Sequence, residues 1–189
     1  MCRKLKELEG KLPMDILNSV YASSITIPIN LDRVLEQLGV KKIPSSFDDL
    51  EKTIGVEQGS ISGLVLYNEK DLGIYYKRDD ELCHKRLIIA HELGHCCKHG
   101  RKLENNYIEM FCDNQDVNET EEAEATLFAS QLLIPEKQLK DLHSKLVQPS
   151  LQKLSELFEV PKELMLKRIM DLKMAYYDDD KKEMIPPCL

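Results

Sequence analysis

The most constraining feature of this chain is an apolar run, residues 87–97, that carries two histidines and one glutamate. Glu92 is the only residue of the run expected to be ionised, which predicts a buried helix. On a helix, His91 and His95 lie one turn apart on the same face, so both imidazoles can bind one metal ion. Glu92 lies about 100° further round, where it can hold a metal-bound water without being a ligand. Burying its carboxylate is costly without a compensating charge, and a metal centre supplies one.

The alternative is a structural core helix in which both histidines and Glu92 have ordinary hydrogen-bond partners. The composition predicts roughly 0.02 chance matches to His-acidic-x-x-His in a chain of this length, which favours the metal site. Gly94, inside the same helix, costs about 1 kcal/mol relative to alanine. That cost is tolerable where another backbone passes close by, which here could be a neighbouring strand or a bound substrate, although simple helix packing explains it equally well.

A catalytic zinc usually has three protein ligands, so a third must come from elsewhere. The metzincin form of the motif requires glycine and histidine at positions that Lys98 and Arg101 occupy, and this class is excluded. His99 lies about 12 Å along the helix axis from His91, too far to share the ion. The helix dipole explains His99 better, since it favours a basic residue at a helix C-terminus. A carboxylate from a second helix is the remaining source.

That second helix is predicted over residues 119–133. Glu121 and Glu122 flank its apolar stripe, whereas Glu124 points away from it. Asn118 and Glu121 resemble a capping box, which gives Glu121 a structural role and makes Glu122 the better ligand. An acidic run is also typical of any helix N-terminus, where carboxylates complement the dipole. The helix angles alone therefore favour Glu122 without excluding Glu121.

The remaining patterns predict an α+β fold that is mainly helical and has one small sheet. A helix ending at Gly39 is followed by a strand, and residues 61–78 are predicted to form a β-hairpin. Residues 101–118 are predicted to be a polar connection, and the charged tail after 175 to lack regular structure. Further helices are predicted over residues 82–99, 136–146, 151–158 and 162–173.

Composition and charge exclude several classes of function. The chain has 42% hydrophobic and 31% charged residues, has no run long enough to span a membrane, and begins without the apolar core of a secretory signal. A net charge of −7 disfavours nucleic acid as the main partner. The six cysteines lack CxxC or dense spacing, which favours reduced thiols and a cytoplasmic protein. Cys96 and Cys97 are predicted to be buried apolar residues rather than metal ligands.

With both helices considered, the chain resembles the ImmA/IrrE family of zinc metallopeptidases over roughly residues 28–173. The family phrase R-F-T-x-A-H-E-x-x-H is followed in outline from Arg86 to His95. The phrase E-x-x-A-N-x-F-A-x-x-L-L-x-P falls in register from Glu122 to Pro135. Two departures stand outside the ligand positions: Thr126 replaces the usual Asn or Asp, and Leu87-Ile88 replaces Phe-Thr.

The resemblance implies that His91, His95 and Glu122 bind one zinc ion, or another divalent ion such as Mn²⁺, and that Glu92 is the general base. It also implies an organisation in four parts. These are an N-terminal helical extension, a zincin-like metallopeptidase domain with a small β-sheet, a C-terminal helical hairpin packed on that domain, and a charged tail, over residues 1–27, 28–146, 147–175 and 176–189.

The implied function is a zinc endopeptidase of narrow specificity that cleaves a transcriptional repressor or regulator, in a bacterial or phage cytoplasm, and so relieves repression. An edge of the 61–78 hairpin could align an extended substrate as an added strand. A further donor normally stabilises the oxyanion in such a reaction. Candidates for this donor are Tyr75, Tyr76, Tyr107 and His143.

Two other functions remain open. A non-catalytic regulator would bind a repressor through the same domain and keep the metal for structure. A helix-turn-helix DNA binder is the third possibility, because residues 151–173 form a predicted helical pair. A packed helical hairpin fits this acidic chain better, and neither direct nucleic-acid binding nor a membrane partner is expected. The basic residues of the pair are Lys162, Lys167, Arg168 and Lys173.

Overall fold

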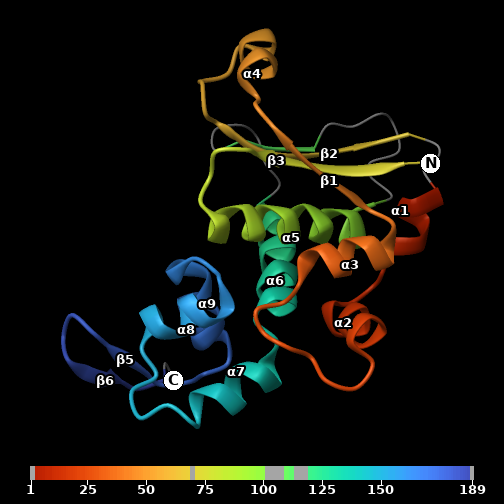
Figure 1. Cartoon of the computed structure of the whole chain (residues 1–189). Helices are drawn as coiled ribbons and strands as arrows, with labels where there is room; N and C mark the ends of the chain where they lie inside the picture. Colours follow the sequence, from red (N-terminus) through yellow and green to blue (C-terminus); the bar gives the residue numbers. More distant parts are fainter. Residues whose placement is uncertain (1–2, 69–70, 101–108, 113–118, 188–189) are drawn as a thin grey trace.

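The computed structural model describes residues 3–68, 71–100, 109–112 and 119–187. It confirms the mainly helical α+β class, with a four-stranded mixed sheet and a separate two-stranded hairpin (Figure 1). The sheet has the order β1-β3-β2-β4. The longest helix among the described residues, α5 (Leu82–Lys98), lies along one face of the sheet, and α4 (Asp48–Ile54) lies on the other side (Figure 1).

The predicted hairpin is present but occupies the middle of the sheet. Strands β2 (Ile61–Tyr67) and β3 (Leu72–Lys77) pair in antiparallel fashion, and β1 (Lys41–Ser45) runs parallel to β3. A fourth strand, β4 (Glu109–Cys112), pairs antiparallel to β2. The expectation that an edge of the hairpin receives substrate is therefore wrong, because β1 and β4 cover both of its edges.

Strand β4 also corrects the prediction of a polar connection over residues 101–118. A four-residue strand carries too short a pattern to be recognised alone, and it forms because β2 offers a ladder to pair with. Its register against β2 shifts between Ile61 and Leu64, which marks a bulge beside Gly63. The buried carboxylate of Glu51, from α4, fixes the start of β2 by accepting hydrogen bonds from the Gly59 and Ile61 amides at 2.8 and 2.9 Å.

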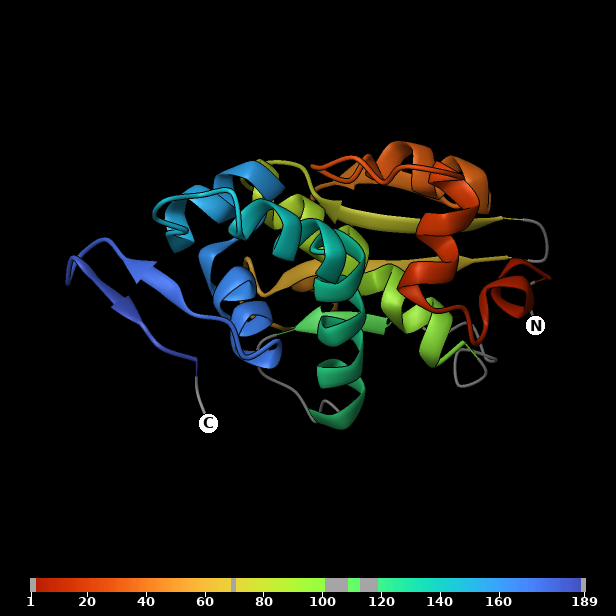
Figure 2. The same ribbon diagram turned by 90° about the horizontal axis from the view of Figure 1, so that it is seen from below.

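The helices other than α4 contribute to one continuous core beneath the sheet. Helix α6 (Glu119–Leu133), which the sequence predicted, packs against α5 (Figures 1 and 2). Helix α3 (Leu31–Leu38) ends at Gly39, which has the left-handed conformation. Helices α1 (Arg3–Leu8) and α2 (Pro13–Tyr21) bury their apolar side chains in the same core. The proposed boundaries between the four parts of the chain remain a prediction.

The C-terminal part contains the predicted helical pair. Helix α7 (Glu136–His143) leads to α8 (Leu151–Phe158) and α9 (Lys162–Asp171), which contact each other. Their shared apolar residues belong to the main core, so the pair is packed on the rest of the molecule. These core residues are Leu154, Phe158, Val160, Leu164 and Ile169.

The expectation that the tail lacks regular structure is wrong. Strands β5 (Tyr176–Asp178) and β6 (Glu183–Ile185) form a hairpin. The charged run makes its turn, because the Asp178 carboxylate accepts hydrogen bonds from the Asp180 and Lys181 amides, both at 3.0 Å. The Tyr177 amide donates to the Pro149 carbonyl at 3.1 Å, which ties the hairpin to the segment before α8. Among the helices in the described part of the chain, none has the length and apolar character needed to cross a membrane.

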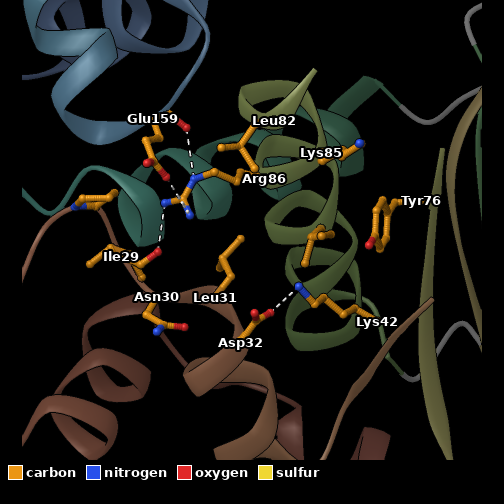
Figure 3. Close-up of a pocket in the computed structure, with 12 residues that line it drawn as sticks. Ile29, Asn30, Leu31, Asp32, Lys42, Tyr76, Leu82, Lys85, Arg86 and Glu159 are labelled. Carbon is orange, nitrogen blue, oxygen red and sulfur yellow. Dashed lines mark hydrogen bonds and ion pairs between the residues drawn. The ribbon is translucent and has the colours of Figure 1, made fainter. Parts of the chain in front are cut away.

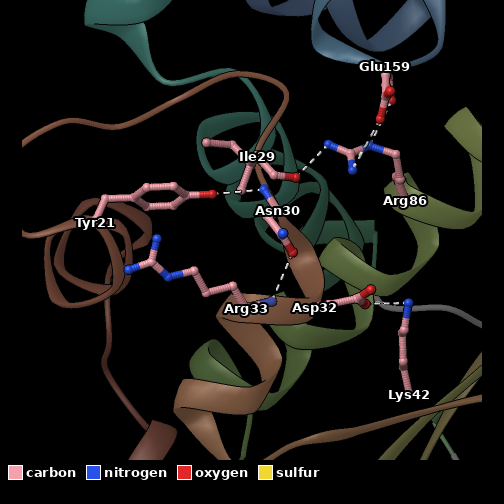
Figure 4. Close-up of polar contacts among 8 residues, drawn as sticks. All are labelled: Tyr21, Ile29, Asn30, Asp32, Arg33, Lys42, Arg86 and Glu159. Carbon is pink, nitrogen blue, oxygen red and sulfur yellow. Dashed lines mark hydrogen bonds and ion pairs between the residues drawn. The ribbon is translucent and has the colours of Figure 1, made fainter.

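Arg86, which is buried near the start of α5, joins three segments that are distant in sequence (Figures 3 and 4). Its Nε donates to the Glu159 carbonyl at 3.0 Å and its Nη2 to the Ile29 carbonyl at 2.9 Å. Its Nη1 lies 3.5 Å from the Glu159 carboxylate. Arg86 therefore connects α5 to the loop before α3 and to the turn between α8 and α9.

Replacing Arg86 with methionine is expected to lower the free energy of unfolding by about 3 kcal/mol, because hydrogen bonds to charged groups contribute roughly 1.5–3 kcal/mol each. Equilibrium urea unfolding measures the change. Lys85→Met, which removes the preceding charge on the same helix, is the control and is expected to change stability by less than about 1 kcal/mol. Equal effects of the two substitutions would contradict this account of Arg86.

Candidate metal centre

Three side chains from α5 and α6 converge on one point. His91 and His95 are 2% and 1% exposed, and their Nε2 atoms lie 2.9 Å apart. Glu122, in the first turn of α6, places Oε2 3.0 Å from the His91 Nε2 and Oε1 3.2 Å from the His95 Nε2. These are the three residues that the sequence predicted as metal ligands, and the structure brings them together.

The donor set fits a zinc ion. Tetrahedral zinc with bonds of about 2.0–2.1 Å separates neighbouring nitrogen and oxygen donors by about 3.3 Å, and the three observed separations are within about 0.4 Å of that value. Two imidazole nitrogens and one carboxylate are a donor set found in catalytic zinc sites, where the fourth position stays open. His91, His95 and Glu122 would therefore hold the metal and leave one position for water or substrate.

The electrostatics of Glu122 suit a ligand role. Burial raises the pKa of its carboxyl, but hydrogen bonds from His91 and His95 outweigh that effect and hold the pKa at about 2. Glu122 is therefore an anion at neutral pH, as a carboxylate ligand must be. Glu121, the alternative, is also half-buried in the first turn of α6. Its proposed capping partner, Asn118, lies outside the described residues.

Gly94 explains how α6 comes close enough to supply a ligand. A Cβ atom at this position would lie 3.0 Å from the Ala125 carbonyl oxygen and 3.1 Å from the Ala125 Cα. The backbone that comes close belongs to a neighbouring helix, so of the explanations given by the sequence it is helix packing, rather than a strand or a substrate, that accounts for Gly94. Because Ala125 follows Glu122 by three residues, the contact at Gly94 sets the distance from Glu122 to the histidines.

Glu92 lies between α5 and the sheet, and only 1% of it is exposed. It faces Gly63 of β2, where a Cβ atom would lie 3.0 Å from the Glu92 Oε1 and would collide with the Ile88 side chain. Gly63 thus makes room for the predicted general base. Sequence reasoning missed Gly63, although an isolated glycine within a strand pattern is a signal for such an approach.

Gly63→Ala is expected to lower the free energy of unfolding by about 1–3 kcal/mol, the usual cost of overpacking, and to displace Glu92. Urea unfolding measures the first effect. The control is Gly73→Ala on β3, where the nearest atoms are side-chain atoms of Ile43 and Tyr75 at 3.1 and 3.2 Å. These side chains can adjust more cheaply than the packed pair beside Gly63. A smaller loss for Gly63→Ala than for Gly73→Ala would contradict this interpretation.

Three of the four candidate oxyanion donors lie in the described part of the chain, and each has surroundings other than the metal ligands. Tyr75 packs with Phe47, Ile61 and Leu64, in a cluster separate from the main core. Tyr76 lines a pocket of about 340 Å³ with Lys42 and Arg86 (Figure 3). The His143 Nε2 lies 2.7 Å from the Ala175 carbonyl oxygen. Tyr107 lies outside the described residues, and the identity of the donor stays a prediction.

Other side chains of α5 and its flanks that could bind a metal make contacts outside the group of His91, His95 and Glu122. The His99 Nε2 lies 3.5 Å from the Glu124 Oε2, and its ring centroid is 5.6 Å from that of His95. Cys96 and Cys97 are fully buried, and burial raises the pKa of the Cys97 thiol to about 12, so it is not a thiolate at neutral pH. A second group of three possible donors, Glu81, Cys83 and His84, lies near the start of α5 with two of its members exposed.

The family model Peptidase_M78, described as the IrrE N-terminal-like domain, matches residues 55–170. The match covers more than half of the chain and includes α5, α6 and the sheet strands β2 and β3. No curated protein matches the chain.

Proposed function

The chain belongs to the IrrE N-terminal-like family of peptidases, and from this premise we propose that it is a zinc-dependent endopeptidase of narrow specificity that cleaves a transcriptional repressor or regulator. The observation that carries the zinc-dependent chemistry is the convergence of His91, His95 and Glu122 within hydrogen-bond distance of one another. The buried carboxylate of Glu92 on the same helix supports hydrolysis rather than metal storage.

When bound, zinc supplies a Lewis acid and lowers the pKa of its water to about 7. The two imidazoles of His91 and His95 and the Glu122 carboxylate would hold the ion. Glu92 accepts a proton from the attacking water and then delivers it to the leaving amine. The missing side chain of Gly63 leaves the space on the sheet side that the buried Glu92 carboxylate needs for both proton transfers.

We assign substrate alignment to β4 rather than to the hairpin. Of the two sheet edges, β4 is adjacent to β2, whose Gly63 faces Glu92, whereas β1 lies beyond β3. An extended peptide that pairs with β4 would therefore lie at the sheet edge nearer to the general base. Main-chain pairing gives affinity without sequence selection, so specificity must come from side-chain contacts.

The resemblance to ImmA/IrrE peptidases supplies the substrate class, a regulator of transcription. The DNA-binding alternative has less support, because the Arg168 Nε donates to the Ile134 carbonyl at 3.1 Å within the core. Of the four basic residues on the helical pair, Arg168 is thus occupied in packing. The non-catalytic alternative shares the same metal centre and is separated from the peptidase only by experiment.

The test is incubation of the zinc-loaded protein with purified helix-turn-helix repressors from the same genome, followed by intact-mass measurement. The expected result is two complementary fragments of one repressor and no cleavage after the zinc is removed with a chelator. Release of repressor from its operator with the repressor intact would contradict the peptidase and favour the regulator that acts by contact alone.

A further inference from the structure

Thr126 lies on α6 one turn after Glu122. Its hydroxyl faces the side of the His91 ring opposite to the nitrogen that faces Glu122. The Thr126 Oγ1 lies 3.3 Å from the His91 Nδ1. The opposite nitrogen of the same ring, Nε2, faces Glu122 and His95. One helix therefore contacts both nitrogens of His91, through a carboxylate at one and a hydroxyl at the other.

The two nitrogens of a neutral imidazole have different roles. A nitrogen that binds a metal must offer its lone pair, so the proton has to be on the other nitrogen. With the His91 Nε2 used for the metal, the Nδ1–H donates to the Thr126 Oγ1. A hydroxyl suits both states of His91, because it can also donate to a bare Nδ1 when the proton is on Nε2.

The position of Thr126 follows from the packing described above. Its neighbour Ala125 lies against Gly94, where the two helix backbones approach most closely. At this short distance, a side chain as small as threonine spans the gap to α5. Thr126 itself is half-buried, so water competes only partly for its hydrogen bond.

We propose that Thr126 is a positioning residue that fixes the tautomer and ring orientation of His91 for metal binding. This inference rests on the proposed metal centre. It gives a role to a position where the sequence departs from the family phrase, and it adds a hydrogen bond beyond the three ligands. Partners of this kind typically contribute 10- to 100-fold to metal affinity.

The experiment compares zinc affinity, by competition with a chromophoric chelator, for the wild type, Thr126→Val and Thr126→Ser. Valine keeps the shape and removes the hydroxyl, and is expected to weaken zinc binding by about 10- to 100-fold. Serine keeps the hydroxyl and is expected to stay within about threefold of the wild type. In the zinc-loaded wild type, proton NMR is expected to show a protected His91 Nδ1–H signal that exchanges faster in Thr126→Val.

Ser130→Ala is the matched control, because Ser130 is a buried hydroxyl on the same helix that donates to the Leu127 carbonyl instead. It is expected to leave zinc affinity unchanged. Equal affinity of Thr126→Val and wild type would overturn the role of Thr126 while leaving the metal centre intact. A wild type that binds no zinc would instead refute the proposed function, so the two failures are distinguishable.

Discussion

Glu92→Gln is expected to lower kcat/KM for the cleaved repressor by about 100- to 10,000-fold, the usual contribution of general acid–base catalysis. Glutamine has the same shape and fits the space beside Gly63, but it cannot accept the proton from water. Because Glu92 is not a ligand, zinc content is expected to remain at one ion per chain. Cleavage rates by mass spectrometry and metal content by elemental analysis measure the two quantities on the same samples.

The control for Glu92→Gln is Glu124→Gln, which removes a carboxylate about half exposed on α6. It is expected to retain most of the activity, since its oxygen pairs with His99 outside the donor set. Wild-type cleavage by Glu92→Gln would rule out Glu92 as the proton carrier. If the Glu92→Gln variant still relieves repression without cleaving the repressor, the non-catalytic regulator that binds the repressor is favoured.

Glu122→Ala is expected to weaken zinc binding by more than about 100-fold, because it removes a ligand, whereas loss of an outer partner alone costs 10- to 100-fold. It also removes the carboxylate whose oxygens contact the Nε2 atoms of His91 and His95, which lie 2.9 Å apart. Metal content after exhaustive dialysis is expected to fall from one zinc per chain to none, and activity with it.

Glu121→Ala is the matched variant for Glu122→Ala, one residue away in the same turn. It is expected to retain zinc and to lose at most the modest stability of a helix cap, about 1 kcal/mol. The reverse result, with zinc lost in Glu121→Ala and kept in Glu122→Ala, would show that the donor set is assigned to the wrong carboxylate.

Local sequence periodicity is enough to predict α5, the helix that carries His91 and His95. The four-residue spacing of His91 and His95 places both rings on one face whatever the rest of the chain does. The same rule found α6 and narrowed its ligand to Glu121 or Glu122. The choice between these two depends on how α6 crosses α5, which Gly94 and Ala125 decide through contacts that no single-helix pattern contains.

Long-range pairing accounts for what the sequence did not predict. Gly63 faces Glu92 across 29 positions, and β4 forms only because β2 is beside it. The candidate donors Tyr75 and Tyr76 are adjacent on β3, so their side chains point to opposite faces and could not both serve one site. The prediction that the tail lacks regular structure is wrong because it rests on charge alone. The Asp178 carboxylate accepts hydrogen bonds from the Asp180 and Lys181 amides, and these stabilise the turn of the β5–β6 hairpin.

The hydrogen bond from Arg86 to Ile29 has a consequence for how the family is delimited. The matched segment begins at residue 55, yet Arg86 inside it depends on a carbonyl at position 29, and apolar side chains from α1 and α2 complete its core. The segment that the family model matches is therefore smaller than the cooperative folding unit. A fragment of residues 55–170 alone would lack the core side chains of α1 and α2, and Arg86 would lose the Ile29 carbonyl, one of its three acceptors. The minimal stable protein therefore extends upstream of the segment that the family model matches.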